Sequence, residues 1–87
     1  NILAASDETV IKLWNLSSGR MFYRLRGHRD LISAIAISPD EQTLASSSLD
    51  GTIKFWSLRT GQLITTFESG RASAIAFSPD GRFLVSS

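Results

Sequence analysis

The sequence repeats itself at an interval of about 40 residues, and this limits the possible folds more than any other feature. Residues 33–47 and 73–87 are identical at ten of fifteen positions when aligned with an offset of 40. Residues 11–19 and 53–61 agree at five of nine positions with an offset of 42. The two offsets differ by two residues, which predicts a short deletion near residues 68–71. An interval of this length is typical of architectures in which similar units stack on one another.

Each repeat has the pattern of short antiparallel strands. Runs rich in Ile, Leu, Phe and Thr alternate with clusters of Gly, Pro, Asp and Ser, and we expect no helix. In the middle repeat, strands are predicted at residues 31–38, 43–48, 52–57 and 62–67. The dipeptide Asp50-Gly51 favours a two-residue hairpin turn with positive φ at both positions. Four antiparallel strands per repeat predict one blade of a β-propeller.

The chain is therefore expected to be all-β, with one complete blade between two partial blades. The partial blades are predicted at residues 1–26 and 73–87, and the complete blade at residues 31–67. The chain has no initiator Met and both ends read as strands. We expect the 87 residues to be a fragment of about two repeats. Propellers have about 4 to 8 blades, so two repeats cannot close a ring alone.

The composition argues against several classes of function. The chain has no Cys, which excludes a disulfide framework and a thiolate zinc or redox site. Its formal charge of +1 gives no general reason to expect nucleic acid or an anionic membrane as partner. One His and scattered carboxylates predict no metal site, and no Gly-rich phosphate loop is present, so no cofactor is expected. With no leader or long apolar run visible, we expect a cytoplasmic protein.

Several motifs of the middle repeat resemble those of the Trp-Asp (WD) repeat β-propellers. The matching elements are Gly27-His28, Ser38-Pro39-Asp40 and the run 44–56 that ends in Trp56, with an echo at residues 9–15. The resemblance covers essentially the whole chain. It implies that such a propeller acts as a non-enzymatic scaffold that presents loops to other proteins or peptides.

The resemblance also implies a structural hydrogen-bond network of His28, Ser46, Asp50 and Trp56. Ser48 is the second candidate for the hydroxyl member. Such a network would satisfy the indole N–H and both imidazole nitrogens in a partly buried setting. A catalytic triad is the alternative for these side chains, but nothing in the sequence supplies an oxyanion site, so we predict that the chain is not an enzyme.

Three departures from the family pattern restrict this network to the middle blade. The Asp that follows Trp in the family is Asn15 in one copy and Ser57 in the other. The connection into the last blade reads Gly70-Arg71 and has no His. In the first repeat, residues 7–9 do not align cleanly with residues 49–51.

By the same resemblance, five residues are expected at the partner-binding surface. They are Leu31, Ser33, Leu49, Arg71 and Ser73. Leu49 is the most informative, because an apolar side chain beside an exposed turn suits a protein contact. Isolated exposed leucines are also common on protein surfaces.

Basic residues interleaved with aromatic ones occur once, at Arg20, Arg24, Arg26 and Arg29. They could mark a surface for nucleic acid or an acidic peptide. The simpler interpretation is an outer strand whose charges prevent pairing between sheet edges, and we expect no nucleic-acid partner.

Two further hypotheses accompany the scaffold. The chain could be a regulatory or sensor module of a larger signalling protein with a catalytic domain elsewhere. Alternatively, identical copies of the 87 residues could assemble into a closed ring. The expected partners are thus other proteins or peptides, the remaining blades of a parent chain, or further copies, and not a membrane.

Overall fold

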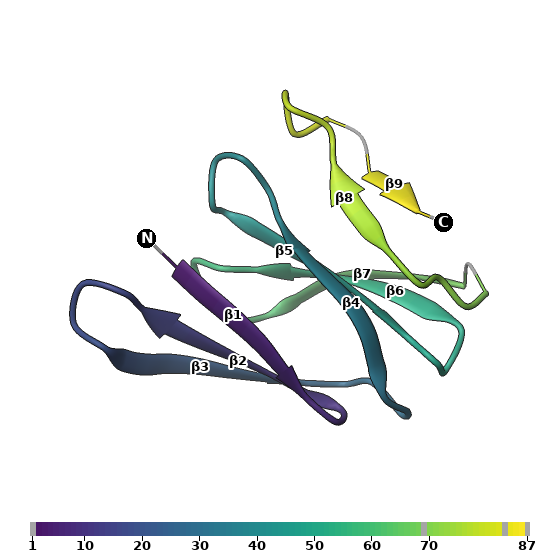
Figure 1. Ribbon diagram of the computed structural model, residues 1–87, viewed down its shortest axis with the longest axis horizontal. Coiled ribbons are helices and arrows are strands. Elements are labelled where there is room, and N and C mark those ends of the chain that lie inside the picture. The colour runs from purple at the N-terminus through teal and green to yellow at the C-terminus, as the bar shows by residue number, and fades with distance from the viewer. Residues whose placement is uncertain (1, 69, 83, 87) are drawn as a thin grey trace.

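The computed structural model describes residues 2–68, 70–82 and 84–86, and all of its regular structure is β (Figure 1). Its strands form three antiparallel sheets. These are β1 (Ile2–Asp7), β2 (Val10–Asn15) and β3 (Arg20–Arg26); then β4 (Ile32–Ile37), β5 (Thr43–Ser48), β6 (Thr52–Ser57) and β7 (Leu63–Glu68); then β8 (Ile75–Phe77) and β9 (Leu84–Ser86). The predicted all-β class is confirmed, with a four-stranded sheet between a three-stranded and a two-stranded one. Ser87, the last position of the repeat match, lies outside the described residues.

Strands β5 and β6 have the predicted bounds, whereas β4 and β7 differ by one residue at their ends. The backbone amide of Leu31 is hydrogen-bonded to the Asp30 side chain at 2.7 Å, so β4 begins only at Ile32. The carbonyl of Gln62 accepts a hydrogen bond from the Ser57 amide within the β6–β7 turn, and β7 begins at Leu63. Local hydrogen bonds at the turns therefore set these boundaries.

The hairpin between β5 and β6 differs from the predicted two-residue turn. Gly51 has a φ of 87°, but Asp50 does not have a positive φ. The loop spans residues 49–51, and Gly51 donates to the Ser48 carbonyl at 3.1 Å. Only one position in this longer loop needs the left-handed conformation, and glycine occupies it.

The first two sheets share one register. Leu3 lies opposite Trp14 in the first sheet, as Leu44 lies opposite Trp56 in the second. The first hairpin is one residue shorter and turns at Glu8, whose φ is 58°. This missing residue explains why residues 7–9 could not be aligned with residues 49–51.

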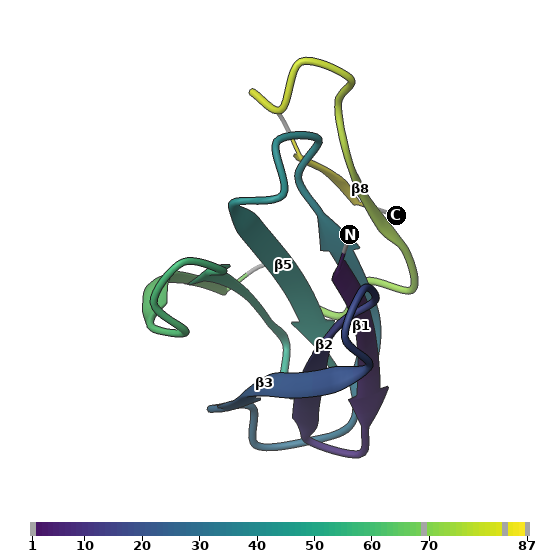
Figure 2. The same ribbon diagram turned by 90° about the vertical axis from the view of Figure 1, so that its left-hand side faces the viewer.

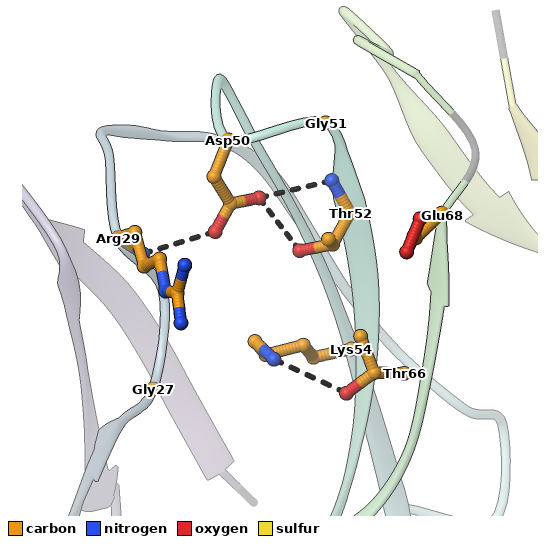
Figure 3. A pocket seen from close by; sticks show the side chains of 8 residues that line it. All are labelled: Gly27, Arg29, Asp50, Gly51, Thr52, Lys54, Thr66 and Glu68. Atoms are coloured by element: carbon orange, nitrogen blue, oxygen red, sulfur yellow. Dashed lines mark hydrogen bonds between the residues drawn. The ribbon is translucent and has the colours of Figure 1, made fainter.

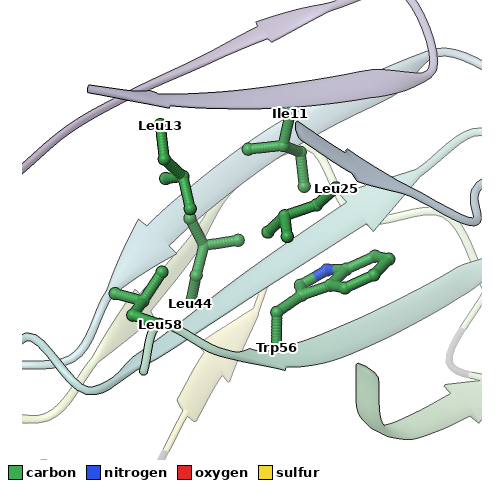
Figure 4. Close-up of a cluster of buried hydrophobic side chains, with 6 residues drawn as sticks. All are labelled: Ile11, Leu13, Leu25, Leu44, Trp56 and Leu58. Atoms are coloured by element: carbon green, nitrogen blue, oxygen red, sulfur yellow. The ribbon is translucent and has the colours of Figure 1, made fainter. Parts of the chain in front are cut away.

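The hydrophobic core lies between the first and second sheets. Successive strand residues point to opposite faces, so each sheet places alternate apolar side chains in this interface. The core consists of Ile11, Leu13 and Leu25 from the first sheet and Leu44, Trp56 and Leu58 from the second (Figure 4). Their contact holds the two sheets face to face.

The sheets follow one another with their inner strands side by side. Strand β4 contacts both β1 and β8 and lies between them in Figure 1; Figure 2 shows the same arrangement with the first sheet toward the viewer. On the far face of the second sheet, the Phe55 ring meets Phe77 edge to face with centroids 6.3 Å apart. At the outer end of the first interface, the Tyr23 hydroxyl donates to the Arg59 carbonyl at 3.0 Å. This stacking of sheets about aligned inner strands is the arrangement of propeller blades.

Candidate functional site

A continuous hydrogen-bond network joins four segments of the second sheet and its loops. His28 lies in the loop between β3 and β4, Ser46 is on β5, Asp50 is in the hairpin and Trp56 is on β6. The Ser46 hydroxyl lies 2.7 Å from Nε2 of His28 and accepts the Trp56 indole N–H at 2.9 Å. Nδ1 of His28 lies 3.1 Å from Asp50 Oδ2. The structure thus brings together all four residues that the sequence placed in one network.

The donors and acceptors of this network are complementary. The indole N–H can only donate, so the Ser46 oxygen accepts from it and the Ser46 proton is directed to Nε2 of His28. That leaves the ring proton on Nδ1, where it is donated to Asp50. Because the His28 side chain and Ser46 are fully buried, an unpaired group here would cost about 1–3 kcal/mol.

Asp50 is the electrostatic anchor of the site. Burial raises the pKa of its carboxyl group, but hydrogen bonds from the Thr52 hydroxyl, the Arg29 amide and the His28 ring lower it more, as does the Thr52 amide. The pKa of Asp50 therefore lies well below its usual value of 3.8. The carboxylate ties the β3–β4 loop to the β5–β6 hairpin in its ionised form.

Sequence reasoning missed two residues that donate hydrogen bonds to Asp50. Oγ1 of Thr52 lies 2.6 Å from Oδ1, and the Arg29 amide lies 3.0 Å from Oδ2. The order Asp-Gly-Thr was the available signal for Thr52, because an Asp side chain readily accepts from the residue two positions later. The Arg29 amide left no signal, since every residue except proline carries one.

Ser48, the second candidate for the hydroxyl, has another role. Its hydroxyl donates to the Asp30 carbonyl at 3.0 Å and accepts from the Asp50 amide at 3.1 Å. It therefore braces the same loop and hairpin through their backbones. Ser46 alone lies between His28 and Trp56.

The geometry gives Ser46 no access to a substrate. A nucleophilic serine must present its oxygen to the substrate beside oxyanion donors. Ser46 has no exposed surface, and its oxygen contacts both His28 and the Trp56 indole. What this arrangement does chemically is fix the conformation of two loops.

Four of the predicted contact residues, Leu31, Leu49, Arg71 and Ser73, lie on three connections at the same end of the second sheet, at the right of Figure 1, and Ser33 lies on β4 close to Leu31. The Leu49 amide donates to the Leu31 carbonyl at 2.8 Å, which holds the hairpin beside the β3–β4 loop. Leu31 is exposed and Leu49 is half-buried. Arg71 and Ser73 are exposed on the β7–β8 connection.

Ser33 has an internal role in addition to its surface position. Its hydroxyl donates to the Ala72 carbonyl at 2.7 Å and lies 2.9 Å from the Ser47 hydroxyl. Ala72 is buried between Arg71 and Ser73. Ser33 and Ser47 therefore hold the β7–β8 connection against the second sheet, a contact with no signal in the sequence.

A polar cavity of about 470 Å³ opens beside the network (Figure 3). It is lined by Gly27, Arg29, Asp50, Gly51, Thr52, Lys54, Thr66 and Glu68. Lys54 donates to the Thr66 hydroxyl at 3.1 Å, and the Asp50 carboxylate is occupied by the bonds described above. Arg29, Lys54 and Glu68 thus offer charges of both signs, which suits polar side chains of a partner better than one small anion.

The four arginines do not form a single surface. Strand β3 is the outer edge of the first sheet, and Arg20, Arg24 and Arg26 are exposed along it. Arg29 instead belongs to the loop and lines the cavity. Among residues 2–68, 70–82 and 84–86, no three His, Asp or Glu side chains are grouped as a metal site would require. The same residues contain no helix that could span a membrane.

Comparison with known proteins identifies the fold. The family model described as "WD domain, G-beta repeat" (WD40) matches residues 19–57 and 61–87, well over half of the chain. The chain belongs to the WD40 repeat family. Its four-stranded sheet is accordingly one complete WD40 propeller blade, and its three-stranded and two-stranded sheets are partial blades.

Several curated WD40 relatives align with most of this chain. Small ribosomal subunit protein RACK1y of Oryza sativa subsp. japonica is 32% identical over 84 residues, which cover 95% of this chain and 25% of the relative. Ribosome assembly protein 4 of Saccharomyces cerevisiae is 41% identical over 67 residues, covering 76% and 13%. Eukaryotic translation initiation factor 3 subunit I of Scheffersomyces stipitis is 32% identical over 85 residues, covering 97% and 24%. The chain spans a quarter or less of the length of these relatives.

Proposed function

We propose that this WD40 chain is a non-enzymatic scaffold that binds partner proteins or peptides at the end of the second sheet. WD40 proteins bind other proteins, and by name the relatives above are a small ribosomal subunit protein, a ribosome assembly protein and a subunit of a translation initiation factor. The proposal includes the blade boundaries 1–26, 31–67 and 73–87 and a cytoplasmic setting. The alternative of a regulatory module beside a catalytic domain draws no support from these relatives.

One observation carries the proposal. The buried network fixes the β3–β4 loop and the β5–β6 hairpin from the protein side. On their solvent side lies Leu31, which is 48% exposed, beside Leu49. A contact surface that is already ordered loses little conformational freedom on binding. Ser33, Arg71 and Ser73 extend the surface toward the third sheet.

The test begins with a random peptide library selected on the immobilised chain, followed by titration of one selected, labelled peptide. Leu31→Ala and Leu49→Ala should each weaken binding about tenfold, which corresponds to about 1.4 kcal/mol, without lowering the Tm. Arg71→Ala should weaken it less. Leu63→Ala is the matched control, because Leu63 is an equally exposed leucine on β7, away from these loops.

Unchanged peptide binding in the Leu31→Ala and Leu49→Ala variants would show that this surface is not the partner-binding site. A loss of binding in the Leu63→Ala variant alone would place the contact on β7. Peptides that bind only to variants with a lowered Tm would indicate that they recognise the unfolded chain. The proposal would then fail.

A further inference from the structure

The polar cavity of about 470 Å³ beside the network is formed by the second sheet and the loop that leads into it. Two of its lining residues come from the β3–β4 loop, two from the β5–β6 hairpin, and the other four from β6 and β7. Its volume lies within the range of about 300–1,000 Å³ that is typical of ligand sites in proteins. The cavity is therefore large enough to receive side chains of a bound partner.

Arg29 and Lys54 form the cationic part of this cavity. Figure 3 shows the two side chains extending toward each other, Arg29 from the loop and Lys54 from β6. Lys54 donates to the Thr66 hydroxyl at 3.1 Å. Among the described residues, the Arg29 guanidinium has no hydrogen-bond or ion-pair partner. Because an ammonium has three N–H donors and a guanidinium five, most of these donors remain available to an anionic ligand.

Glu68 on β7 forms the anionic part of the cavity. It lies opposite Thr52 in the β6–β7 register, whereas Lys54 lies opposite Thr66. Glu68 and Lys54 are thus diagonal neighbours on one face of the sheet, a relation that places two residues about 7–8 Å apart. In the part of the chain that the structure describes, Glu68 forms no ion pair with Lys54 or Arg29. Opposite charges therefore line one cavity without neutralising each other.

The repeat itself does not require this arrangement of charges. Arg24 and Arg26 of the first sheet have the positions of Thr66 and Glu68 in the second. The first sheet thus has two basic side chains where the second has a hydroxyl and a carboxylate. Since both sheets form with different charges at these positions, the charges of the cavity are available for a role that belongs to the second sheet.

The spacing of the charges matches that of side chains on an extended peptide. Residues i and i+2 of an extended chain point to the same side and lie about 6–7 Å apart. An acidic residue at one of these positions can reach Arg29 and Lys54 while a basic residue at the other reaches Glu68. Hydrogen bonds between such charged groups are stronger than those between neutral ones. A phosphate dianion suits the cavity less well, because the carboxylates of Asp50 and Glu68 repel it.

We propose that the cavity binds an extended segment of a partner protein in which an acidic and a basic residue stand two positions apart. Arg29 and Lys54 hold the acidic side chain, and Glu68 holds the basic one. Arg29 belongs to the same loop as Leu31, so this inference rests on the proposed partner-binding surface and gives its ligand a charge pattern.

Peptide selection tests the charge pattern. The random peptide library is selected in parallel on the unaltered chain and on the Arg29→Gln/Lys54→Gln variant, in which the Arg29 backbone amide still donates to Asp50. Acidic and basic residues two positions apart should be enriched by the unaltered chain and not by the variant. Arg59→Gln is the matched control and should retain the enrichment, because Arg59 is exposed on the β6–β7 turn, away from the cavity.

A charge reversal at Glu68 tests the second contact. One selected, labelled peptide is titrated with its basic residue intact and with that residue replaced by Glu. The replacement should weaken binding to the unaltered chain about fivefold, near the upper limit for an exposed ion pair. On the Glu68→Lys variant the order of the two peptides should reverse. This variant should fold, since Arg26 occupies the same position of the first sheet.

The outcomes separate this inference from the function on which it rests. Peptides whose binding depends on Leu31 but which lack the charge pattern would overturn the inference and leave the partner-binding surface standing. Equal enrichment by the Arg29→Gln/Lys54→Gln variant, or an unchanged order on Glu68→Lys, would overturn it as well. Tighter binding of a peptide with phosphoserine in place of its acidic residue would make phosphate the ligand, against the inference. A selection that yields no binding peptide would overturn both proposals.

Discussion

The first and second sheets are formed by two copies of the same repeat, but only the second contains the buried hydrogen-bond network. Both place a leucine opposite a tryptophan in the same register. The position of Ser46 is occupied by Ala5 in the first sheet, and the first hairpin is shorter. Apolar alternation and turns are therefore enough to form a sheet. The network is a separate device that fixes the loops at one end of it.

The largest expected effect contrasts the two leucines of this shared register. Leu44→Ala should lower the free energy of unfolding by about 2–5 kcal/mol, because it leaves a cavity in the core between the sheets. Leu3→Ala should cost under about 1 kcal/mol in the monomer, since Leu3 is largely exposed. Urea denaturation at a concentration where the chain is monomeric measures both. Similar costs would show that the two positions are equally buried in solution.

Next in size is the contrast between Ser46 and Ala5. Ser46→Ala leaves the Trp56 indole N–H and Nε2 of His28 without their partner, and should cost about 1–3 kcal/mol. The reciprocal Ala5→Ser variant should change stability by less than about 0.5 kcal/mol, because Ala5 is exposed. Urea denaturation of both variants under the same conditions measures the two changes in the free energy of unfolding. An inert Ser46→Ala variant would mean that the network adds no stability.

The pH dependence of stability should depend on Asp50. Its pKa is depressed in the folded chain, so its carboxylate stabilises the fold above the usual pKa of 3.8, and this contribution is lost as the pH falls. We expect Asp50→Asn to be less stable than the unaltered chain at pH 7. The difference should narrow between about pH 4 and pH 2. Denaturation curves across that range provide the measurement, and a constant difference would contradict the assignment.

The smallest effect concerns two turns in which a glutamate has a positive φ. Glu41 and Glu8 have φ values of 59° and 58°, and at the position of Glu41 the next repeat has Gly81, with a φ of 75°. Glu41→Gly and Glu8→Gly should each stabilise the chain by roughly 0.5–1 kcal/mol, because the left-handed conformation is strained for residues with a Cβ. Thermal unfolding would detect this. A gain in only one variant would show that the other glutamate compensates through its contacts.

Much of the fold was readable from the sequence because the repeat supplies the same signals more than once. Alternation and turn residues located the four strands of the middle repeat to within a residue, and the resemblance to the WD-repeat family implied the network. The hairpin was predicted less well, since a two-residue turn and a longer loop share the Asp-Gly signal. Only backbone conformation, with a positive φ at Gly51 alone, separates them.

The surface of the candidate site was harder to predict than its interior. Buried polar groups must find partners, and the family resemblance implied which polar side chains, His28 and Ser46 among them, would be paired. Exposed residues face no such requirement. The internal role of Ser33 depends on the carbonyl of Ala72, 39 residues away, and a backbone acceptor leaves no trace in the sequence.

Tyr23 has a mechanical consequence for an array of such sheets. Its ring lies directly against Gly61, where an added Cβ would come within 2.8 Å of it, and its hydroxyl holds the adjacent turn. At the outer end of the interface between the first and second sheets, the Tyr23 ring therefore lies between the two sheets. At the inner end, β1 and β4 are in contact. Thr65 has the corresponding position in the second sheet and carries no ring to make such a contact. Tyr23 is thus a spacer that keeps the outer ends of the first and second sheets at a fixed separation.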